Sequence, residues 1–272
     1  MARKLMRMIG PLALLFGYAA CEAEPVSIQI IQMQNVGTES CTASVNASEG
    51  LSLGTVDLAL ATNYVAFPLV RNNMDDISNV QGFTPRDGRV ATLDVVLREA
   101  VVEYGALGPI TADLPPRRVI PLAGTVQLNS EATLGIELLD AATLQAIRQA
   151  PEFLVTDSQS QVRPVRTEVT LTTKLVFKGV TVDGREVETN EFFFPLRVCN
   201  GCLITYPPDA ISTEGGTTPN CLAIDPEAED EREPPACPGR VGSDGVFIDC
   251  RDCQGFAVDP VARSLCQPPS GL

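Results

Sequence analysis

The distribution of the cysteines constrains the fold more than any other feature of this sequence. Two of the nine cysteines, Cys21 and Cys41, lie near the N-terminus, and the other seven lie at or beyond Cys199. Residues 201–272 also hold ten of the 21 prolines and no lysine. A segment of this composition buries little apolar surface, so cross-links, each contributing about 2 to 4 kcal/mol, are expected to hold it in place.

The N-terminus has the pattern of a secretory signal. Three basic residues, Arg3, Lys4 and Arg7, precede 14 uncharged residues at positions 8–21. A positive start followed by a short apolar stretch is typical of signal peptides. The stretch is shorter than the roughly 20 residues that a membrane-spanning helix needs, which disfavours a retained transmembrane anchor. We therefore predict that the chain is exported.

The segment YAAC, residues 18–21, resembles the lipobox of bacterial lipoproteins, in which small residues precede a cysteine that becomes the lipid-modified first residue. The resemblance implies a signal peptide over residues 1–20 and a lipid on Cys21. It also implies sorting to the outer membrane, because Glu22 follows the cysteine. Two or three acyl chains hold a protein stably, whereas one holds it marginally. The alternative is ordinary cleavage after Ala23 and release of a soluble protein.

Eight cysteines remain after processing at either site, and an even set in an exported protein predicts four disulfides. They are Cys41, Cys199, Cys202, Cys221, Cys237, Cys250, Cys253 and Cys266. If all are bonded, at least one of the last seven must pair with Cys41 and so fasten the tail to the body.

Zinc binding and redox activity are alternatives for the two C-x-x-C pairs, at 199–202 and 250–253. An oxidising compartment favours disulfides over zinc. The sequence CNGCLITYPP shows no helix of the kind that follows a thioredoxin-like motif.

Residues 21–200 are expected to form one body made of β-strands almost throughout. Strand patterns occur at residues 26–34, 56–60, 64–70, 90–97, 101–104 and 119–128, and the change of phase within the first predicts a bulge. The best-specified element is a hairpin over residues 166–199, in which Asp183-Gly184 predicts a two-residue type I′ turn. This turn pairs Val169 with Val198, Leu171 with Leu196, Thr173 with Phe194 and Leu175 with Phe192, and a bulge is expected around Gly179.

One short helix is expected after Asp140, which suits an N-cap, and Pro151 would end it. About eight strands with one helix predict an all-β fold, namely an immunoglobulin-like β-sandwich. Residues 201–272 are expected to form a small, mostly irregular module stapled by disulfides, with a last hairpin turning at Asp244-Gly245. The proline-rich stretch 108–124 leaves open a body of two small domains.

Residue types and motifs that are absent from the sequence exclude several classes of function. The chain has no histidine, which removes the commonest general base and the serine and cysteine triads built on it. Phosphate-binding and dinucleotide-binding glycine motifs are absent from the sequence. Without residues 1–20, 17 basic residues stand against 34 acidic ones, and the net charge of −17 disfavours nucleic acid. We predict no cofactor, no metal and no catalytic residue.

These features predict a non-catalytic, lipid-anchored envelope protein that offers its sandwich surface to a protein partner or to a second copy of itself. Phe193, an aromatic residue on the polar face of the hairpin, is either a partner contact or, more simply, a single exposed side chain. Two alternatives remain open: an exported hydrolase that uses two carboxylates, and a lipid-binding or glycan-binding module. The absence of tryptophan weakens glycan binding.

The segments YAAC, AFPLV and VCNGCL, with the cysteines that follow, resemble uncharacterised envelope lipoproteins of myxobacteria, which carry a cysteine-rich C-terminal module. The resemblance implies a location in the cell envelope and an arrangement of body and cysteine-rich module, and it implies no activity.

Overall fold

The structure is a computed structural model of the whole chain. It describes residues 27–37, 40–74, 93–106, 111–156, 158–207, 221, 235 and 237–268. The expected signal peptide at residues 1–20 and the expected lipid site at Cys21 lie outside the described residues. Within them, no helix is both long enough and apolar enough to cross a membrane.

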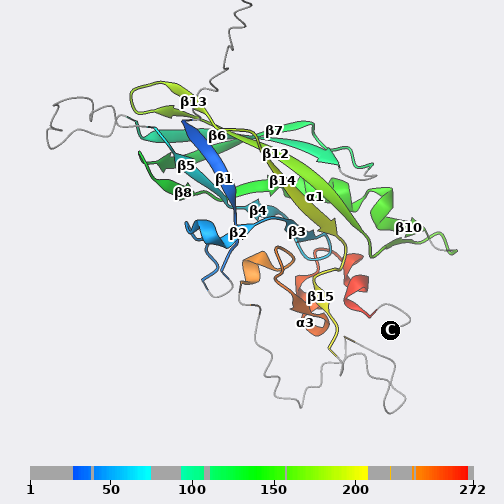
Figure 1. Cartoon of the computed structure of the whole chain (residues 1–272). Helices are drawn as coiled ribbons and strands as arrows, with labels where there is room; N and C mark the ends of the chain where they lie inside the picture. Colours follow the sequence, from blue (N-terminus) through cyan, green and yellow to red (C-terminus); the bar gives the residue numbers. More distant parts are fainter. Residues whose placement is uncertain are drawn as a thin grey trace, which may run out of the picture.

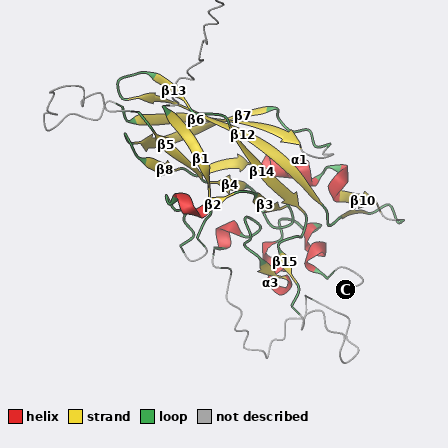
Figure 2. Cartoon of the chain, viewed as in Figure 1, coloured by secondary structure: helices red, strands yellow, loops and turns green. Residues whose placement is uncertain are grey.

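Two sheets make up most of the fold (Figure 1, Figure 2). The smaller sheet has the antiparallel order β2 (Gly50–Leu51), β1 (Ile28–Gln34), β5 (Pro68–Asn72) and β8 (Glu131–Thr133). The larger sheet has the order β3 (Gly54–Asp57), β14 (Phe192–Cys199), β12 (Glu168–Thr181), β6 (Val95–Ala106) and β7 (Arg117–Val126), and β13 (Glu186–Glu188) also pairs with β12. In the larger sheet β3 runs parallel to β14, and the other neighbours are antiparallel.

Three strand pairs and two helices complete the described elements. The pairs are β4 (Tyr64–Ala66) with β9 (Ile136–Leu139), β10 (Leu154–Thr156) with β11 (Val162–Pro164), and β15 (Ile204–Thr205) with β16 (Ile248–Asp249). The helices are α1 (Ala141–Arg148) and α3 (Cys250–Phe256), and short 3-10 turns lie at Ala47–Glu49, Pro151–Phe153, Pro238–Arg240 and Ala262–Cys266.

The two sheets share one hydrophobic core. Its buried side chains come from both, for example Ile28 and Ile30 of β1 and Leu175, Phe177 and Phe194 of the larger sheet. The sheets curl like half-barrels. Alternation of apolar and polar residues along each strand directs one row of side chains inward, which is why a strand-rich sequence of this kind closes over a core. The prediction of an all-β fold is confirmed.

The hairpin β12–β14 has the predicted register. Val169 faces Val198, Leu171 faces Leu196, Thr173 faces Phe194 and Leu175 faces Phe192. The turn differs, however, from the predicted two-residue type I′ form. Thr181 pairs with Arg185 across three residues, and Gly184 adopts a positive φ of 94° while Asp183 does not.

A glycine in the left-handed region after a turn gives a three-residue loop with a bulge, because only the last position needs the positive φ. Near the turn the register is therefore offset by one residue, so Gly179 faces Val187. A further irregularity between this point and Leu175 restores the predicted pairing. The bulge expected around Gly179 is thus present as a change of register on either side of it.

Other strand predictions need correction in their boundaries. The expected strand at 64–70 is two strands, because β4 pairs with β9 whereas β5 joins the smaller sheet. The runs at 90–97 and 101–104 belong to one strand, β6, which contains a register shift between Leu97 and Glu99; residues 90–92 lie outside the described part. The bulge predicted within 26–34 is present between Ile30 and Gln32.

The predicted helix is present as α1. Asp140 accepts a hydrogen bond from the backbone N–H of Thr143, and the helix ends before Pro151. The tail, expected to be mostly irregular, contains a seven-residue helix, α3, that was not predicted. Asp249 caps it by accepting from the N–H of Arg251.

The last hairpin expected at Asp244-Gly245 does not form. Both residues have positive φ, as a tight turn requires, but the flanking segments pair elsewhere. Ser243 bridges to Val56 of β3, and β16 pairs with β15 in parallel. The prediction of a tight turn at Asp244-Gly245 is therefore correct, but tertiary contacts determine which strands the flanking segments pair with.

A second, smaller hydrophobic cluster lies among the tail residues (yellow to red in Figure 1) and includes Ala59 and Leu60 from the body. Because body side chains contribute to this cluster, it forms where the two parts meet. The division into a body at 21–200 and a module at 201–272 stays a prediction.

Candidate functional site

All eight remaining cysteines are paired, as their even number predicts. The pairs are Cys41–Cys237, Cys199–Cys202, Cys221–Cys250 and Cys253–Cys266, with Cα atoms 5.4 to 5.9 Å apart. The tail residue that joins Cys41 is Cys237. The two C-x-x-C pairs therefore do not meet in a shared zinc site: Cys199 and Cys202 bond to each other, whereas Cys250 and Cys253 have partners elsewhere.

The tail covers the outer edge of the larger sheet. Strand β3 is hydrogen-bonded to β14 on one side, and on its other side it meets tail residues 242–244. The N–H of Asp57 donates to the carbonyl of Gly242 at 2.8 Å, and the N–H of Asp244 donates to the carbonyl of Thr55 at 2.8 Å. An uncovered strand edge exposes unpaired backbone groups to other chains, so this segment protects the sheet. We call this contact between β3 and residues 242–244 the seam.

Asp57 sits at one end of the seam and is fully buried. Its carboxylate accepts three backbone hydrogen bonds, from Ala59 at 2.9 Å, Gly201 at 2.7 Å and Leu203 at 2.8 Å. One of these donors, Gly201, lies in the loop closed by the Cys199–Cys202 disulfide, and another, Leu203, follows that loop directly. A body side chain thus fixes the place where the chain passes into the tail.

Burial raises the pKa of the Asp57 carboxyl, since a low-dielectric site disfavours the charged form. The three N–H groups and the positive charge of Arg166 oppose this effect without cancelling it. The Arg166 guanidinium also binds the loop, because it donates to the carbonyl of Gly201 at 2.8 Å. It lies over the ring of Tyr206 at 5.0 Å and donates to that hydroxyl.

The Cys199–Cys202 disulfide lies directly against this carboxyl. A carboxylate oxygen of Asp57 and the two sulfur atoms all lie within 4.8 Å of one another. Cys199, the last residue of β14, is buried, whereas Cys202 is partly exposed. The group of Asp57, Cys199, Cys202 and Arg166 is the candidate functional site, and we call it the Asp57 site.

Asp244 holds the other end of the seam. Its carboxylate accepts from the N–H of Thr55 at 3.0 Å and from the hydroxyl of the buried Tyr64 at 2.8 Å, and it pairs with Arg240 at 2.5 Å. Burial raises the pKa of Asp244. Burial, together with the neighbouring Asp244 charge, holds the pKa of Tyr64 well above its usual range. With every group in this set partnered, its role is to fasten the tail.

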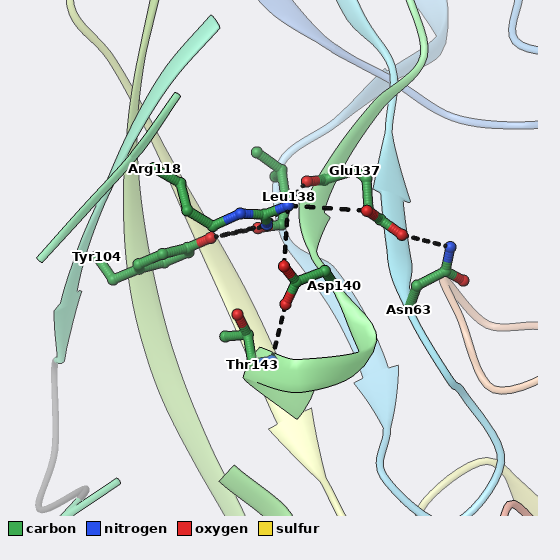
Figure 3. Close-up of polar contacts among 7 residues, drawn as sticks. All are labelled: Asn63, Tyr104, Arg118, Glu137, Leu138, Asp140 and Thr143. Atoms are coloured by element: carbon green, nitrogen blue, oxygen red, sulfur yellow. Dashed lines mark hydrogen bonds and ion pairs between the residues drawn. The ribbon is translucent and has the colours of Figure 1, made fainter. Parts of the chain in front are cut away.

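Figure 3 shows a third polar cluster, centred on Arg118 of β7. The guanidinium donates to the carbonyls of Glu137 and Leu138 at 3.3 and 3.2 Å and pairs with Asp140 at 3.2 Å. The hydroxyl of Tyr104 donates to the same Leu138 carbonyl at 2.6 Å. Asp140 is also the cap of α1, so this cluster ties the helix to the larger sheet and to β9.

Two pockets are formed by described residues; the first is lined mainly by polar side chains, and the second is small. One is lined by Arg71, Asn72, Asn73, Asn129, Ser130, Glu131 and Val45, and the other by Asn35, Val36, Cys237, Arg240, Asp244 and Val246. Each contains one carboxylate, and that carboxylate is paired with an arginine. Neither pocket supplies the two carboxyls that the hydrolase alternative needs, or the large apolar cavity that lipid binding needs.

The outer face of the larger sheet presents Phe193, whose side chain is 59% exposed. Across the strands it neighbours Lys174, which pairs with Glu103 at 2.7 Å and with Glu191 at 3.0 Å. Val119 of β7 is 53% exposed on an edge strand of the sheet. The prediction that Phe193 lies on the polar face of the hairpin is correct.

Comparison with known proteins leaves the family open. No family model matches the chain, and no curated protein matches it. Among solved structures, a late embryogenesis abundant (LEA) protein is similar at a TM-score of 0.25 and 8% identity, over 54% of this chain and 67% of that one. A similarity of this size supports no assignment of fold or function.

Sequence reasoning found the cysteines of the site but missed its carboxyl. Asp57 stands within an apolar run, VDLALA, where a charge interrupts residues that are otherwise buried. A carboxylate in such a run is a signal in itself, because it needs partners when it is buried. Arg166 gave no comparable signal, since its role depends on segments about 35 to 100 residues away.

Proposed function

We propose that the protein is a non-catalytic, lipid-anchored component of the bacterial cell envelope, held in the outer membrane through Cys21. Its body, by this proposal an immunoglobulin-like sandwich, offers a rigid surface to a protein partner or to a second copy. The main support is the full pairing of eight cysteines, with Cys41–Cys237 spanning 196 residues. Such bonds persist in oxidising compartments, in keeping with the N-terminal signal pattern.

The outer face of the larger sheet is the surface we assign to the partner. Phe193 there is among the most exposed large apolar side chains of the described residues, and it faces the charged Lys174 across the strands. Exposed aromatic residues within a polar rim recur as anchors of protein interfaces. The dense ion pairs around Lys174 would set the orientation of the partner and contribute little affinity.

The anchor is tested by palmitate labelling of whole cells followed by mass measurement of the purified protein. We expect acyl groups on Cys21 in the wild type and none in Cys21→Ser, which should leave the membrane fraction. A wild-type chain that begins at Glu24 and carries no lipid would reject the anchor.

The surface is tested by crosslinking in intact envelopes and co-purification. Phe193→Ser should lose the crosslinked partner, or the crosslinked dimer, while Val162→Ser, an equally exposed apolar position on β11, should keep it. Equal recovery of the same species from the two variants would contradict the assignment of the surface.

A further inference from the structure

The Cys199–Cys202 disulfide is poorly suited to a purely structural role. It spans a sequence separation of 3, against 13, 29 and 196 for the others. In the chain-entropy description, the stabilisation from a disulfide grows with the loop that it closes, so this bond restricts the unfolded chain least. The loop it closes is already fixed by the hydrogen bonds of Asp57 and Arg166.

The surroundings of this disulfide have the features of a thiol exchange site. Reactive cysteines lie in partly exposed positions near positive charge. Cys202 is partly exposed and Cys199 is buried, so Cys202 is the more accessible of the two to an incoming thiol. Arg166 binds the loop between them, and the carboxyl of Asp57 lies beside both sulfurs. By contrast, Cys221, Cys250, Cys253 and Cys266 are fully buried.

We propose that Cys199 and Cys202 form a redox-active pair that exchanges electrons with a dithiol on another protein, with Asp57 transferring the proton at Cys199. This activity goes beyond the proposed envelope role and does not depend on the lipid or on the Phe193 surface.

The exchange proceeds in two steps. A thiolate of the partner dithiol, its proton released to water, attacks the Sγ of Cys202. The disulfide breaks, and Cys199 leaves with the electron pair and takes a proton from the Asp57 carboxyl, which regains one from water. The second partner thiol then attacks the partner's own sulfur in the mixed disulfide, and Cys202 leaves with that thiol's proton. Two electrons and two protons have then passed to the pair, and the partner carries a disulfide.

Asp57 suits the proton step because burial raises its pKa, so its protonated form is accessible nearer to neutral pH than that of an ordinary aspartate. The sulfur of Cys199 also lies 3.5 Å from the carbonyl oxygen of Val56, which can accept a hydrogen bond from the thiol after reduction. Both contacts favour release of Cys199 as the neutral thiol.

The test reduces the folded mature protein with dithiothreitol, traps thiols by alkylation at timed intervals, and assigns each pair by mass spectrometry. We expect Cys199–Cys202 to be reduced while Cys221–Cys250 and Cys253–Cys266 remain oxidised. Asp57→Asn should slow reduction of Cys199–Cys202 about 100-fold, the usual scale of general acid catalysis. The rate for Cys41–Cys237, in which Cys41 is exposed, should not change and serves as the internal control.

Two results would overturn the proposal: reduction of Cys199–Cys202 only together with the buried pairs, or equal rates for this pair in the wild type and in a folded Asp57→Asn. If Asp57→Asn unfolds, all four disulfides will be reduced together. The proposal is then tested with variants that each lack one cysteine of the 199–202 pair. Cys199→Ser leaves the Cys202 thiol, which should react with an aromatic disulfide at least about tenfold faster than the Cys199 thiol of Cys202→Ser. Equal rates would reject the exchange site. Failure of the redox proposal leaves the proposed lipid anchor unaffected, because palmitate labelling tests the anchor separately.

Discussion

At the scale of single residues, Asp57 shows how one buried carboxylate organises two parts of the chain. Three backbone N–H groups from two segments converge on it, at 2.7 to 2.9 Å. Hydrogen bonds to a charged acceptor are stronger than neutral ones, and the same donors would be costly if left without a partner. Removal of this side chain therefore costs more than its size suggests.

We expect Asp57→Ala to lower the free energy of unfolding by at least about 3 kcal/mol, because buried donors lose their acceptor at about 1 to 3 kcal/mol each. Urea unfolding of the oxidised protein measures the loss. Asp113→Ala, at an exposed position, is the matched control and should stay within about 0.5 kcal/mol of the wild type. Equal stability of the two variants would show that the Asp57 contacts contribute nothing.

The raised pKa of Asp57 also predicts a pH dependence. The folded form binds the proton more tightly than the unfolded form, whose pKa is near 3.8. The stability due to this shift is fully present below the unfolded pKa and is lost as pH rises through the folded pKa. In urea unfolding at pH values from the unfolded pKa upward through the folded pKa, the stability of the wild type relative to Asp57→Asn should therefore fall as pH rises. A difference that grows with pH would show a lowered pKa.

At the scale of elements, the seam depends on the close approach of two backbones. Gly242 has a positive φ of 83°, and a Cβ placed on it would lie 2.6 Å from the Cβ of Leu60. Its carbonyl accepts the hydrogen bond from Asp57 N–H. A side chain at this position therefore forces the tail away from β3, and the strand edge loses its cover.

Gly242→Ala and Gly245→Ala separate crowding from backbone strain. Gly245 also has a positive φ, 78°, but a Cβ there would meet nothing within 4 Å. We expect a loss of about 1 kcal/mol for Gly245→Ala from conformation alone. Gly242→Ala should lose about 3 kcal/mol, since overpacking adds about 1 to 3. It should also speed hydrogen exchange at the amide of Asp57; unchanged exchange would show that the seam tolerates the side chain.

At the scale of the whole molecule, the tail has little core of its own and is held by bonds to the body. Its small hydrophobic cluster includes Ala59 and Leu60 of the body. Its backbone is hydrogen-bonded to β3, and Cys237 forms a disulfide with Cys41. The larger the loop that a disulfide closes, the more it restricts the unfolded chain. The Cys41–Cys237 bond is thus the cross-link that most stabilises the joined state.

We expect Cys41→Ser/Cys237→Ser to lower the free energy of unfolding by about 5 kcal/mol, and Cys199→Ser/Cys202→Ser by about 2 kcal/mol, from loop closure. Chemical unfolding of both double variants, with the remaining disulfides intact, gives the comparison. A larger loss from the pair at 199 and 202 would show that this bond has a structural role that its short loop does not explain.

Much of the body was predictable because its signals are local. The register of the hairpin follows from alternating residues around Asp183-Gly184, and α1 follows from Asp140 and Pro151. Turn chemistry acts over a few residues, so sequence alone reports it. The limit of this sequence-based prediction is visible at the turn itself, where Gly184 but not Asp183 has a positive φ and the loop has three residues instead of two.

The sequence by itself also determined that eight cysteines would pair and that the tail would reach Cys41, since an even set with seven members on one side permits nothing else if all are bonded. Only the tertiary structure decided that Cys237 is that partner, that β4 and β5 separate, and that Asp57 receives the tail. The physical reason is distance along the chain. Eight cysteines permit 105 pairings, and packing of segments up to 196 residues apart selects one of them.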